Sequence, residues 1–312
     1  MNGELIGREA ELSEIEAFLD RPVDGLRVMV LKGEPGIGKS TIWQAGVAAA
    51  RERAFRVLTS RPAETEQTLP YVVLGDLFAG VETGALEELE APRRRAFEAA
   101  LLRTEADLPV DPRAIGVAIH TLLPILSRPT GLVLAIDDDQ WMDASSRATL
   151  EFALRRANDQ PILLLVARRI DGGPTRAFED AIDAPDVERL RVGALSVGAI
   201  QLLLRSRLGV TFPRPTLMRL HEASGGNPFF ALELARARSR DPSLDLIAPL
   251  AVPPSLERLV ATRLETLALP TREALLLIAA HGRMPVGLLK ALGVAEDVLE
   301  PAVTAQVIET AG

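Results

Sequence analysis

A glycine-rich loop that ends in lysine and serine constrains this chain more than any other segment. Residues 33–40 read GEPGIGKS and match the pattern G-x-x-x-x-G-K-[ST] in full. An apolar run precedes the loop and a helical pattern follows it. In this context such a loop binds phosphate through backbone N–H groups and the helix N-terminus. The sequence therefore predicts a P-loop nucleotide-binding domain, and the competing interpretation is a tight turn between a strand and a helix.

The parts of this loop have separate expected roles. Lys39 should reach the β- and γ-phosphates of a nucleotide, and Ser40 should place its hydroxyl on Mg²⁺. We expect the hydroxyl of Thr41 near the α-phosphate. The predicted cofactors are ATP or ADP with Mg²⁺. The predicted phosphate-binding residues are Gly33, Pro35, Gly36, Ile37, Gly38, Lys39, Ser40 and Thr41.

Three consecutive carboxylates follow a second apolar run, at residues 132–136. Charges at the end of a buried strand are costly without a partner, and a magnesium ion beside the phosphate loop would supply one. Asp137 is therefore predicted to hold Mg²⁺, and Asp138 to orient or deprotonate the attacking water. The alternative is that the acids simply begin a solvated loop. We assign Asp139 to the loop, and we expect Asp143 to cap a helix instead of binding metal.

Five apolar runs flanked by turn signals predict buried strands of a parallel sheet. They lie at residues 26–31, 55–59, 131–136, 161–167 and 190–195. Helical patterns separate these runs along the chain. We therefore predict an α/β P-loop NTPase domain with a doubly wound, five-stranded parallel sheet between helices.

Beyond residue 196 the strand signals stop and helical patterns continue. We predict a nucleotide-binding domain at residues 1–195, a small helical domain that acts as a lid at 196–250, and a third piece at 251–312. Proline-rich punctuation marks the second boundary. Within the third piece, amphipathic patterns predict helices at residues 255–267, 271–281 and 285–292.

Two adjacent arginines end the fourth predicted strand. This strand should lie between the phosphate-loop strand and the acidic strand, so one arginine should point toward the γ-phosphate and sense or stabilise it. The other is then solvated or paired with an acid. We favour Arg168 over Arg169 for the γ-phosphate. The predicted catalytic residues are Lys39, Asp138 and Arg168.

Composition excludes several classes of protein. The net charge of −8 argues against a chain built mainly to coat nucleic acid or an anionic membrane. Without cysteine, the chain has no disulfide framework, thiolate metal site or cysteine nucleophile. The N-terminus is unlike a signal peptide, and no run of about 18 apolar residues could cross a membrane. These features predict a cytoplasmic protein without a membrane partner.

Together these motifs resemble the nucleotide-binding module of the large ATP-binding LuxR-type transcriptional regulators. Those regulators are STAND-class ATPases related to AAA+ proteins, and the module is similar to that of the maltose-regulon activator. Six segments carry the resemblance, which covers essentially the whole chain. They are LIGRE at residues 5–9, the phosphate loop through Thr41, residues 69–77, IDDDQWMD at 136–143, GGNPF at 225–229 and residues 252–264.

The resemblance implies further site residues and domains. The opening segment, with Ile6, Gly7 and Arg8, would lie against the adenine, and Pro228 would pack near the base. Residues 251–312 would begin a winged-helix domain that is partial here, so the chain is expected to be a fragment or a shortened regulator. DNA would bind only through a C-terminal domain absent from this chain, since no basic recognition helix is present.

A slowly hydrolysing, Mg²⁺-dependent ATP switch is the function that the sequence favours, with nucleotide state controlling domain arrangement or self-association. Asp138 stands where typical AAA+ motors carry glutamate, and this departure fits a slow switch better than a fast motor. The main alternative is a ring-forming AAA+ motor with an arginine finger from a neighbour. A P-loop small-molecule kinase and a domain that only binds nucleotide also remain open.

Overall fold

The structure is a computed structural model, and it divides the chain into two compact units, residues 1–195 and 196–312. Each unit is described by itself. The structure describes residues 5–103, 111–170, 177–240, 264, 267–281, 288–289, 292, 294–304 and 308.

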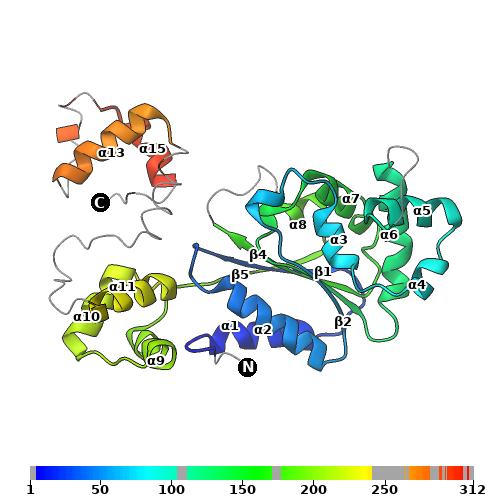
Figure 1. Ribbon diagram of the computed structural model, residues 1–312, viewed down its shortest axis with the longest axis horizontal. Coiled ribbons are helices and arrows are strands. Elements are labelled where there is room, and N and C mark those ends of the chain that lie inside the picture. The colour runs from blue at the N-terminus through cyan, green and yellow to red at the C-terminus, as the bar shows by residue number, and fades with distance from the viewer. Residues whose placement is uncertain are drawn as a thin grey trace. The chain divides into compact units, whose positions relative to one another are not determined.

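A five-stranded parallel sheet forms the centre of the first unit (Figure 1). Its strands are β1 (Arg27–Gly33), β2 (Arg56–Ser60), β3 (Leu132–Ile136), β4 (Ile162–Arg169) and β5 (Asp186–Arg191), in the order β2-β3-β4-β1-β5. The predicted five-stranded parallel sheet is confirmed. The fourth strand also lies between the phosphate-loop strand and the acidic strand, as predicted.

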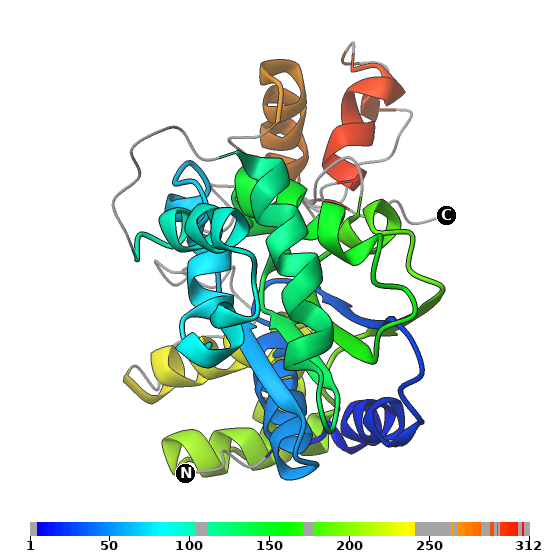
Figure 2. The same ribbon diagram turned by 90° about the vertical axis from the view of Figure 1, so that its right-hand side faces the viewer.

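Alternating residues of each strand face two separate hydrophobic cores, which is the period of two that a sheet covered on both faces requires. In β1, Val28 and Val30 belong to one core, while Met29 and Leu31 belong to the other. The second core packs against α1 (Glu9–Asp20) and α2 (Lys39–Glu52). The opposite face is covered by α3 (Val72–Phe78), α4 (Thr83–Glu87), α5 (Ala91–Ala100), α6 (Pro112–Leu126), α7 (Ala144–Leu154) and α8 (Phe178–Ala181) (Figures 1 and 2).

The position of the fifth strand corrects the sequence prediction. Residues 190–195 were expected to form it, but β5 begins four residues earlier, at Asp186, and ends at Arg191. This segment is charged, so its apolar content gives no signal. Arg27 on the neighbouring strand contacts both Asp186 (3.2 Å) and Glu188 (3.4 Å), and Arg21 contacts the same two acids. Ion pairing at the sheet edge therefore replaces the hydrophobic pattern by which buried strands are recognised.

The second unit is helical where it is described. α9 (Val197–Leu208), α10 (Arg214–Ser224) and α11 (Pro228–Arg240) pack against one another. α13 (Leu269–His281) packs against α15 (Glu296–Thr304), with Leu275 and Ala302 buried between them. The predicted helix at 271–281 corresponds to α13, whereas those at 255–267 and 285–292 and the boundary at 250 lie almost wholly outside the described residues.

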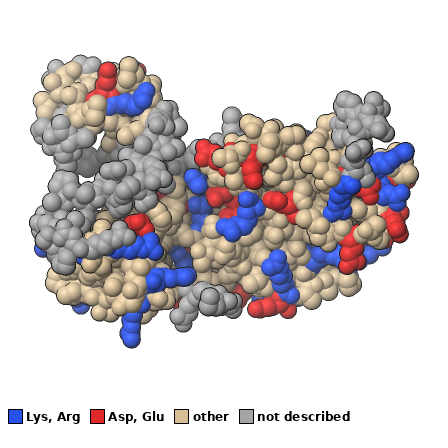
Figure 3. Space-filling model, viewed as in Figure 1, with Lys and Arg blue, Asp and Glu red and all other residues tan. Residues whose placement is uncertain are grey.

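The surface of the first unit carries charges of both signs. On the face shown in Figure 3, Lys and Arg side chains lie beside Asp and Glu side chains across this unit. None of the helices that the structure describes has the length and apolar character needed to span a membrane.

Candidate active site

The phosphate loop leaves β1 at Gly33 and enters α2 after Gly38, as the sequence motif requires. Gly38 precedes the helix with a φ of 104°, a conformation that side chains other than glycine's rarely adopt. A Cβ on Gly33 would lie 2.8 Å from Cγ2 of Ile37 and 3.0 Å from the carbonyl oxygen of Val192. The two terminal glycines of the motif are therefore needed for different reasons, one for backbone conformation and one for close packing.

Two buried cations hold the loop. The Lys39 ammonium donates a hydrogen bond to the carbonyl of Glu34 (2.8 Å), which brings the lysine side chain back across the loop. The guanidinium of Arg8, 5% exposed, donates to the carbonyls of Ile37 (2.7 Å) and Gly193 (2.8 Å). Arg8 thus ties the segment before α1 to the phosphate loop and to the chain that follows β5.

Ser40 and Asp137 meet at the end of the sheet although they are 97 residues apart in sequence. The hydroxyl of Ser40 donates to Oδ1 of Asp137 over 3.1 Å, and Oδ2 lies 3.3 Å from Nε of Arg61. Burial raises the pKa of Asp137, and the neighbouring carboxylate of Asp138 adds to that effect. A buried carboxylate next to a hydroxyl, both beside the phosphate loop, provides the hard oxygen ligands that Mg²⁺ prefers.

A magnesium ion at this point would need few protein ligands. Mg²⁺ in nucleotide sites is bound through one or two protein groups together with phosphate and water. Among the residues that the structure describes, no group of three or more His, Asp or Glu could hold a metal ion. Ser40 and Asp137 therefore fit an ion that is shared with a nucleotide.

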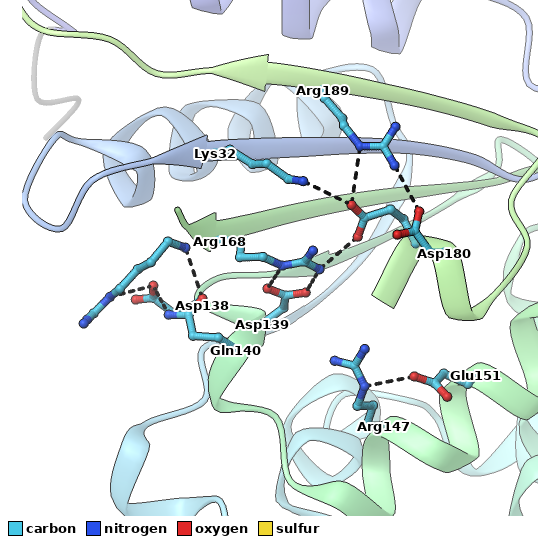
Figure 4. Close-up of polar contacts among 11 residues, drawn as sticks. Lys32, Asp138, Asp139, Gln140, Arg147, Glu151, Arg168, Asp180 and Arg189 are labelled. Carbon is cyan, nitrogen blue, oxygen red and sulfur yellow. Dashed lines mark hydrogen bonds and ion pairs between the residues drawn. The ribbon is translucent and has the colours of Figure 1, made fainter. Parts of the chain in front are cut away.

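Residues 137–143, which we call the acidic turn, continue from β3 and place each acid in a different environment. Asp138 adopts a left-handed backbone conformation with a φ of 56° and begins the short 3-10 helix Asp139–Trp141. Its carboxylate accepts a hydrogen bond from the side-chain amide of Gln140 (2.7 Å) and lies 3.6 Å from Nε of Arg169 (Figure 4). Asp138 is thus held at the mouth of the site with 27% of its side chain exposed.

The two arginines at the end of β4 have different partners. Arg168 is buried and forms a two-pronged contact with the carboxylate of Asp139, and its guanidinium also lies 2.9 Å from the carboxylate of Glu179 (Figure 4). Burial alone would lower the pKa of Arg168, but the hydrogen-bonded carboxylate of Asp139 and the charge of Glu179 raise it above its ordinary value. Arg168 is therefore the more buried and more tightly paired of the two arginines.

Arg169 faces the opening of the site. It is paired with Gly33, the first residue of the phosphate loop, in the register of β4 and β1. Its guanidinium lies near Asp138 and 5.3 Å from the ring centre of Trp141, and about a third of its side chain is exposed. Trp141 thus packs against an arginine of the site.

Glu179 extends the charged cluster to two further strands. It is contributed by α8, and its carboxylate lies 3.5 Å from Nζ of Lys32 on β1 and 3.6 Å from Nε of Arg189 on β5 (Figure 4). Burial alone would raise the pKa of Glu179, but Arg168 and then Lys32 lower it below its ordinary value. The cluster joins β1, β4, β5 and the acidic turn behind the phosphate site.

Asp143 caps α7, as predicted. Its carboxylate accepts hydrogen bonds from the backbone N–H of Ser146 (2.8 Å), Tyr71 (2.9 Å) and Val73 (3.2 Å). The same side chain therefore also holds the N-terminus of α3.

The structure brings together the phosphate loop, Asp137, Asp138 and the two arginines of β4, all within the first unit. Pro228 lies in the second unit, where it begins α11, and the side chain of Asn227 accepts a hydrogen bond from the N–H of Phe229 (3.1 Å). Gly7 adopts a φ of 68° just before Arg8, and the roles of Ile6, Gly7 and Arg8 at the adenine stay predictions.

Several residues with contacts at this site were not predicted as site residues, among them Arg61, which lies 3.3 Å from Asp137. Asp139 was assigned to the loop and Gln140 had no predicted role, and Glu179 stands 40 residues beyond Asp139 in a stretch without a motif. A cavity of about 320 Å³ lies elsewhere, between β2 and the C-terminal end of α3, and no predicted site residue lines it.

The sheet order and the phosphate loop define a P-loop NTPase. The AAA ATPase domain family model matches residues 4–166, more than half of the chain. The chain therefore belongs to the AAA ATPase domain family.

One curated protein and several solved structures also match this chain. An uncharacterized protein of Rhizobium meliloti (strain 1021) is 26% identical over 94% of this chain, which spans 31% of the length of that protein. The ORC2 protein of Aeropyrum pernix, solved in complexes with ADPNP and ADP, matches with 18% identity, 99% and 83% coverage of the two chains and a TM-score of 0.55. The RuvB Holliday junction branch migration motor of Thermotoga maritima gives 19% identity, 96% and 86% coverage and a TM-score of 0.44. The likeness to ORC2 concerns the fold alone.

Proposed function

We propose that this chain binds ATP with Mg²⁺ and hydrolyses it slowly, as a regulatory switch whose nucleotide state controls domain arrangement or self-association. The observation that carries the proposal is the 3.1 Å contact between Ser40 and Asp137 beside the phosphate loop. These two groups would hold Mg²⁺, whose charge offsets that of the β- and γ-phosphates. Lys39 would bind the same phosphates, and Thr41 the α-phosphate.

Asp138 is the candidate to orient or deprotonate the attacking water. Its position next to Asp137 and its partial exposure support this role, because a general base must reach water near the γ-phosphate. Its carboxylate also has two neighbours, Gln140 and Arg169, whose contacts would fix its orientation toward that water.

Arg169 is the better candidate to contact the γ-phosphate, in place of Arg168. The contacts of Arg168 with Asp139 and Glu179 would have to break before it could turn to a nucleotide, and such buried pairs are costly to break. Arg169 is paired with Gly33 in the sheet and remains partly exposed. A guanidinium in that position could report whether a γ-phosphate is present.

The finer parts of the proposal come from the sequence resemblance. They are the place of this chain within a LuxR-type transcriptional regulator of the cytoplasm, contacts of Ile6, Gly7, Arg8 and Pro228 with the adenine, lid and partial winged-helix domains, and DNA binding through a part outside this chain. The hydrogen bond from Arg8 to the carbonyl of Ile37 supports the adenine contacts of the opening segment indirectly, because it fixes that segment to the phosphate loop.

Light scattering on the protein without nucleotide, with ADP and with ATP tests the switch. We expect a change of mass or hydrodynamic size with ATP that ADP does not produce, because only ATP carries the γ-phosphate that Arg169 would contact. Arg169→Met should remove the difference between ATP and ADP. The same size in all three states would contradict the switch.

A ring-forming AAA+ motor is the second candidate, since AAA family membership is equally compatible with it. Steady-state turnover distinguishes the two. Turnover well above about one per second that rises steeply with protein concentration would favour the motor, and slow turnover at all concentrations would favour the switch.

A further inference from the structure

Gln140 connects the acidic turn to the end of β4 through both ends of its side-chain amide. The amide nitrogen donates to Oδ1 of Asp138 over 2.7 Å, and the amide oxygen accepts from the backbone N–H of Arg169 over 3.3 Å (Figure 4). Its own backbone carbonyl accepts from the side chain of Gln67 over 2.8 Å. At 8% exposure, Gln140 is nearly buried with its amide donor and acceptor both used.

The elements that Gln140 joins are already fixed to each other by the residue before it. Asp139 forms its two-pronged contact with Arg168, so the turn and β4 are held by adjacent residue pairs on the two elements. A bidentate contact between arginine and carboxylate restricts the relative geometry of both groups. The side-chain amide of Gln140 therefore contacts Asp138 from a turn whose position relative to β4 is fixed.

The backbone conformation of Asp138 is a second observation that indicates that surrounding residues fix the orientation of its carboxylate. Its left-handed conformation is uncommon for a residue other than glycine, and such a conformation persists where the surrounding structure determines it. Gln140 is one of the surrounding groups that fix the orientation of Asp138, since its side-chain amide donates to the Asp138 carboxylate.

We propose that Gln140 is a positioning residue for ATP hydrolysis, which aims the carboxylate of Asp138 while tying it to the strand that carries Arg169. The inference rests on the proposed function of Asp138. Gln140 touches neither phosphate nor water in this role, so its removal should slow hydrolysis and leave nucleotide binding nearly intact. A misplacement of about 1 Å in a reacting group can cost about 100-fold in rate.

Two substitutions separate positioning of Asp138 from simple support of the turn. Gln140→Ala removes both hydrogen bonds. Gln140→Glu keeps an oxygen for the N–H of Arg169 but sets a carboxylate against Asp138 in place of the donor. If Gln140 only supported the turn through β4, Gln140→Glu would behave like the parent. Gln160→Ala is the matched control, because Gln160 is bonded only to its neighbour Asp159 among the side chains described.

The experiment measures two quantities on the full chain with Mg²⁺: the ATP dissociation constant, by titration, and the single-turnover hydrolysis rate. We expect both Gln140 variants to bind ATP within about 3-fold of the parent and to hydrolyse it at least about 10-fold more slowly. Gln160→Ala should match the parent in both measurements. Retained binding shows that each variant is folded.

Several outcomes would overturn the inference. Parent-like hydrolysis in Gln140→Glu would show that the donor to Asp138 plays no part, and faster hydrolysis in either variant would show that Gln140 restrains Asp138 instead. Equal loss of binding and hydrolysis in both variants would indicate a structural role alone. A parent protein that does not hydrolyse ATP would instead defeat the proposed function, so the two failures are distinguishable.

Discussion

The phosphate loop and the acidic turn lie at the same edge of the sheet but are built in different ways. In the loop, consecutive residues serve one task, because the backbone from Gly33 to Gly38 is shaped to surround phosphate. In the turn, neighbouring acids have separate tasks. Asp137 faces Ser40, Asp138 faces Gln140, Asp139 pairs with Arg168 and Asp143 caps a helix.

The difference shows which functional residues can be identified from the sequence alone. A loop whose chemistry lies in its own backbone can be identified from a local pattern. A turn whose side chains have partners on α2 and β4 cannot, because those partners are distant in sequence. Substitutions within the turn should therefore give effects of different kinds, whereas substitutions in the loop should all weaken nucleotide binding.

The largest effect that we expect within the turn is on hydrolysis, from Asp138→Asn. The change keeps the shape of the side chain but removes the base, so the single-turnover rate should fall by about 100-fold or more while ATP affinity stays within a few fold. Asp159→Asn, an exposed change of the same type, should have no effect. Unchanged hydrolysis in Asp138→Asn would show that the base has been assigned to the wrong residue.

Arg168→Met should mainly affect stability. It leaves Asp139 buried without its cation and removes one of three cations around Glu179, and breaking a buried pair costs about 3–5 kcal/mol. Arg169→Met breaks a partly exposed pair and should cost about 1 kcal/mol or less. Both tryptophans, Trp43 and Trp141, lie in the first unit, so their fluorescence during urea unfolding reports on this unit. Equal losses in the two variants would remove the distinction between these arginines.

A smaller loss of stability should follow from Asp143→Ala. Three backbone N–H groups would lose their acceptor, and loss of a helix cap typically costs about 1–2 kcal/mol. The Mg²⁺ concentration needed for ATP binding should stay the same, since Asp143 is a cap and not a metal ligand. A shift of that concentration by about tenfold or more would assign Asp143 to the metal instead.

The smallest expected effect is a pH dependence from Glu179. Because Arg168 and Lys32 hold its pKa below the ordinary value of 4.5, the ionised group stabilises the fold above that pH. This contribution is lost as pH falls through the lowered pKa, with a slope of at most about 1.4 kcal/mol per pH unit. Glu179→Gln should therefore lose less stability than the parent when unfolding is compared between about pH 5 and pH 3. An identical slope in both proteins would mean that Glu179 is not paired as described.

Local chemistry explains which features the sequence could predict. The sheet, the phosphate loop and the helix cap at Asp143 follow from apolar runs, glycine spacing and capping preferences that act over a few residues. Arg168 and Arg169 could not be told apart, because alternate residues of a strand face opposite sides and the sequence does not show which side holds the acid. Asp139 and Glu179 became an ion-pair cluster only through β4. The fifth strand was predicted too late in the chain because residues 186–189 carry acids that pair with Arg21 and Arg27 and so give no apolar signal.

Calorimetric titration of ATP with Mg²⁺ into the parent, Lys39→Ala and Lys290→Ala tests whether the phosphate loop binds the nucleotide. Lysine is scarce in this chain, and Lys290 lies in the second unit, so its loss controls for the change of charge. We predict that Lys39→Ala weakens binding by at least about 100-fold, because a charge-assisted phosphate contact is lost, while Lys290→Ala binds like the parent. Binding of ATP to Lys39→Ala as tightly as to the parent would contradict the account.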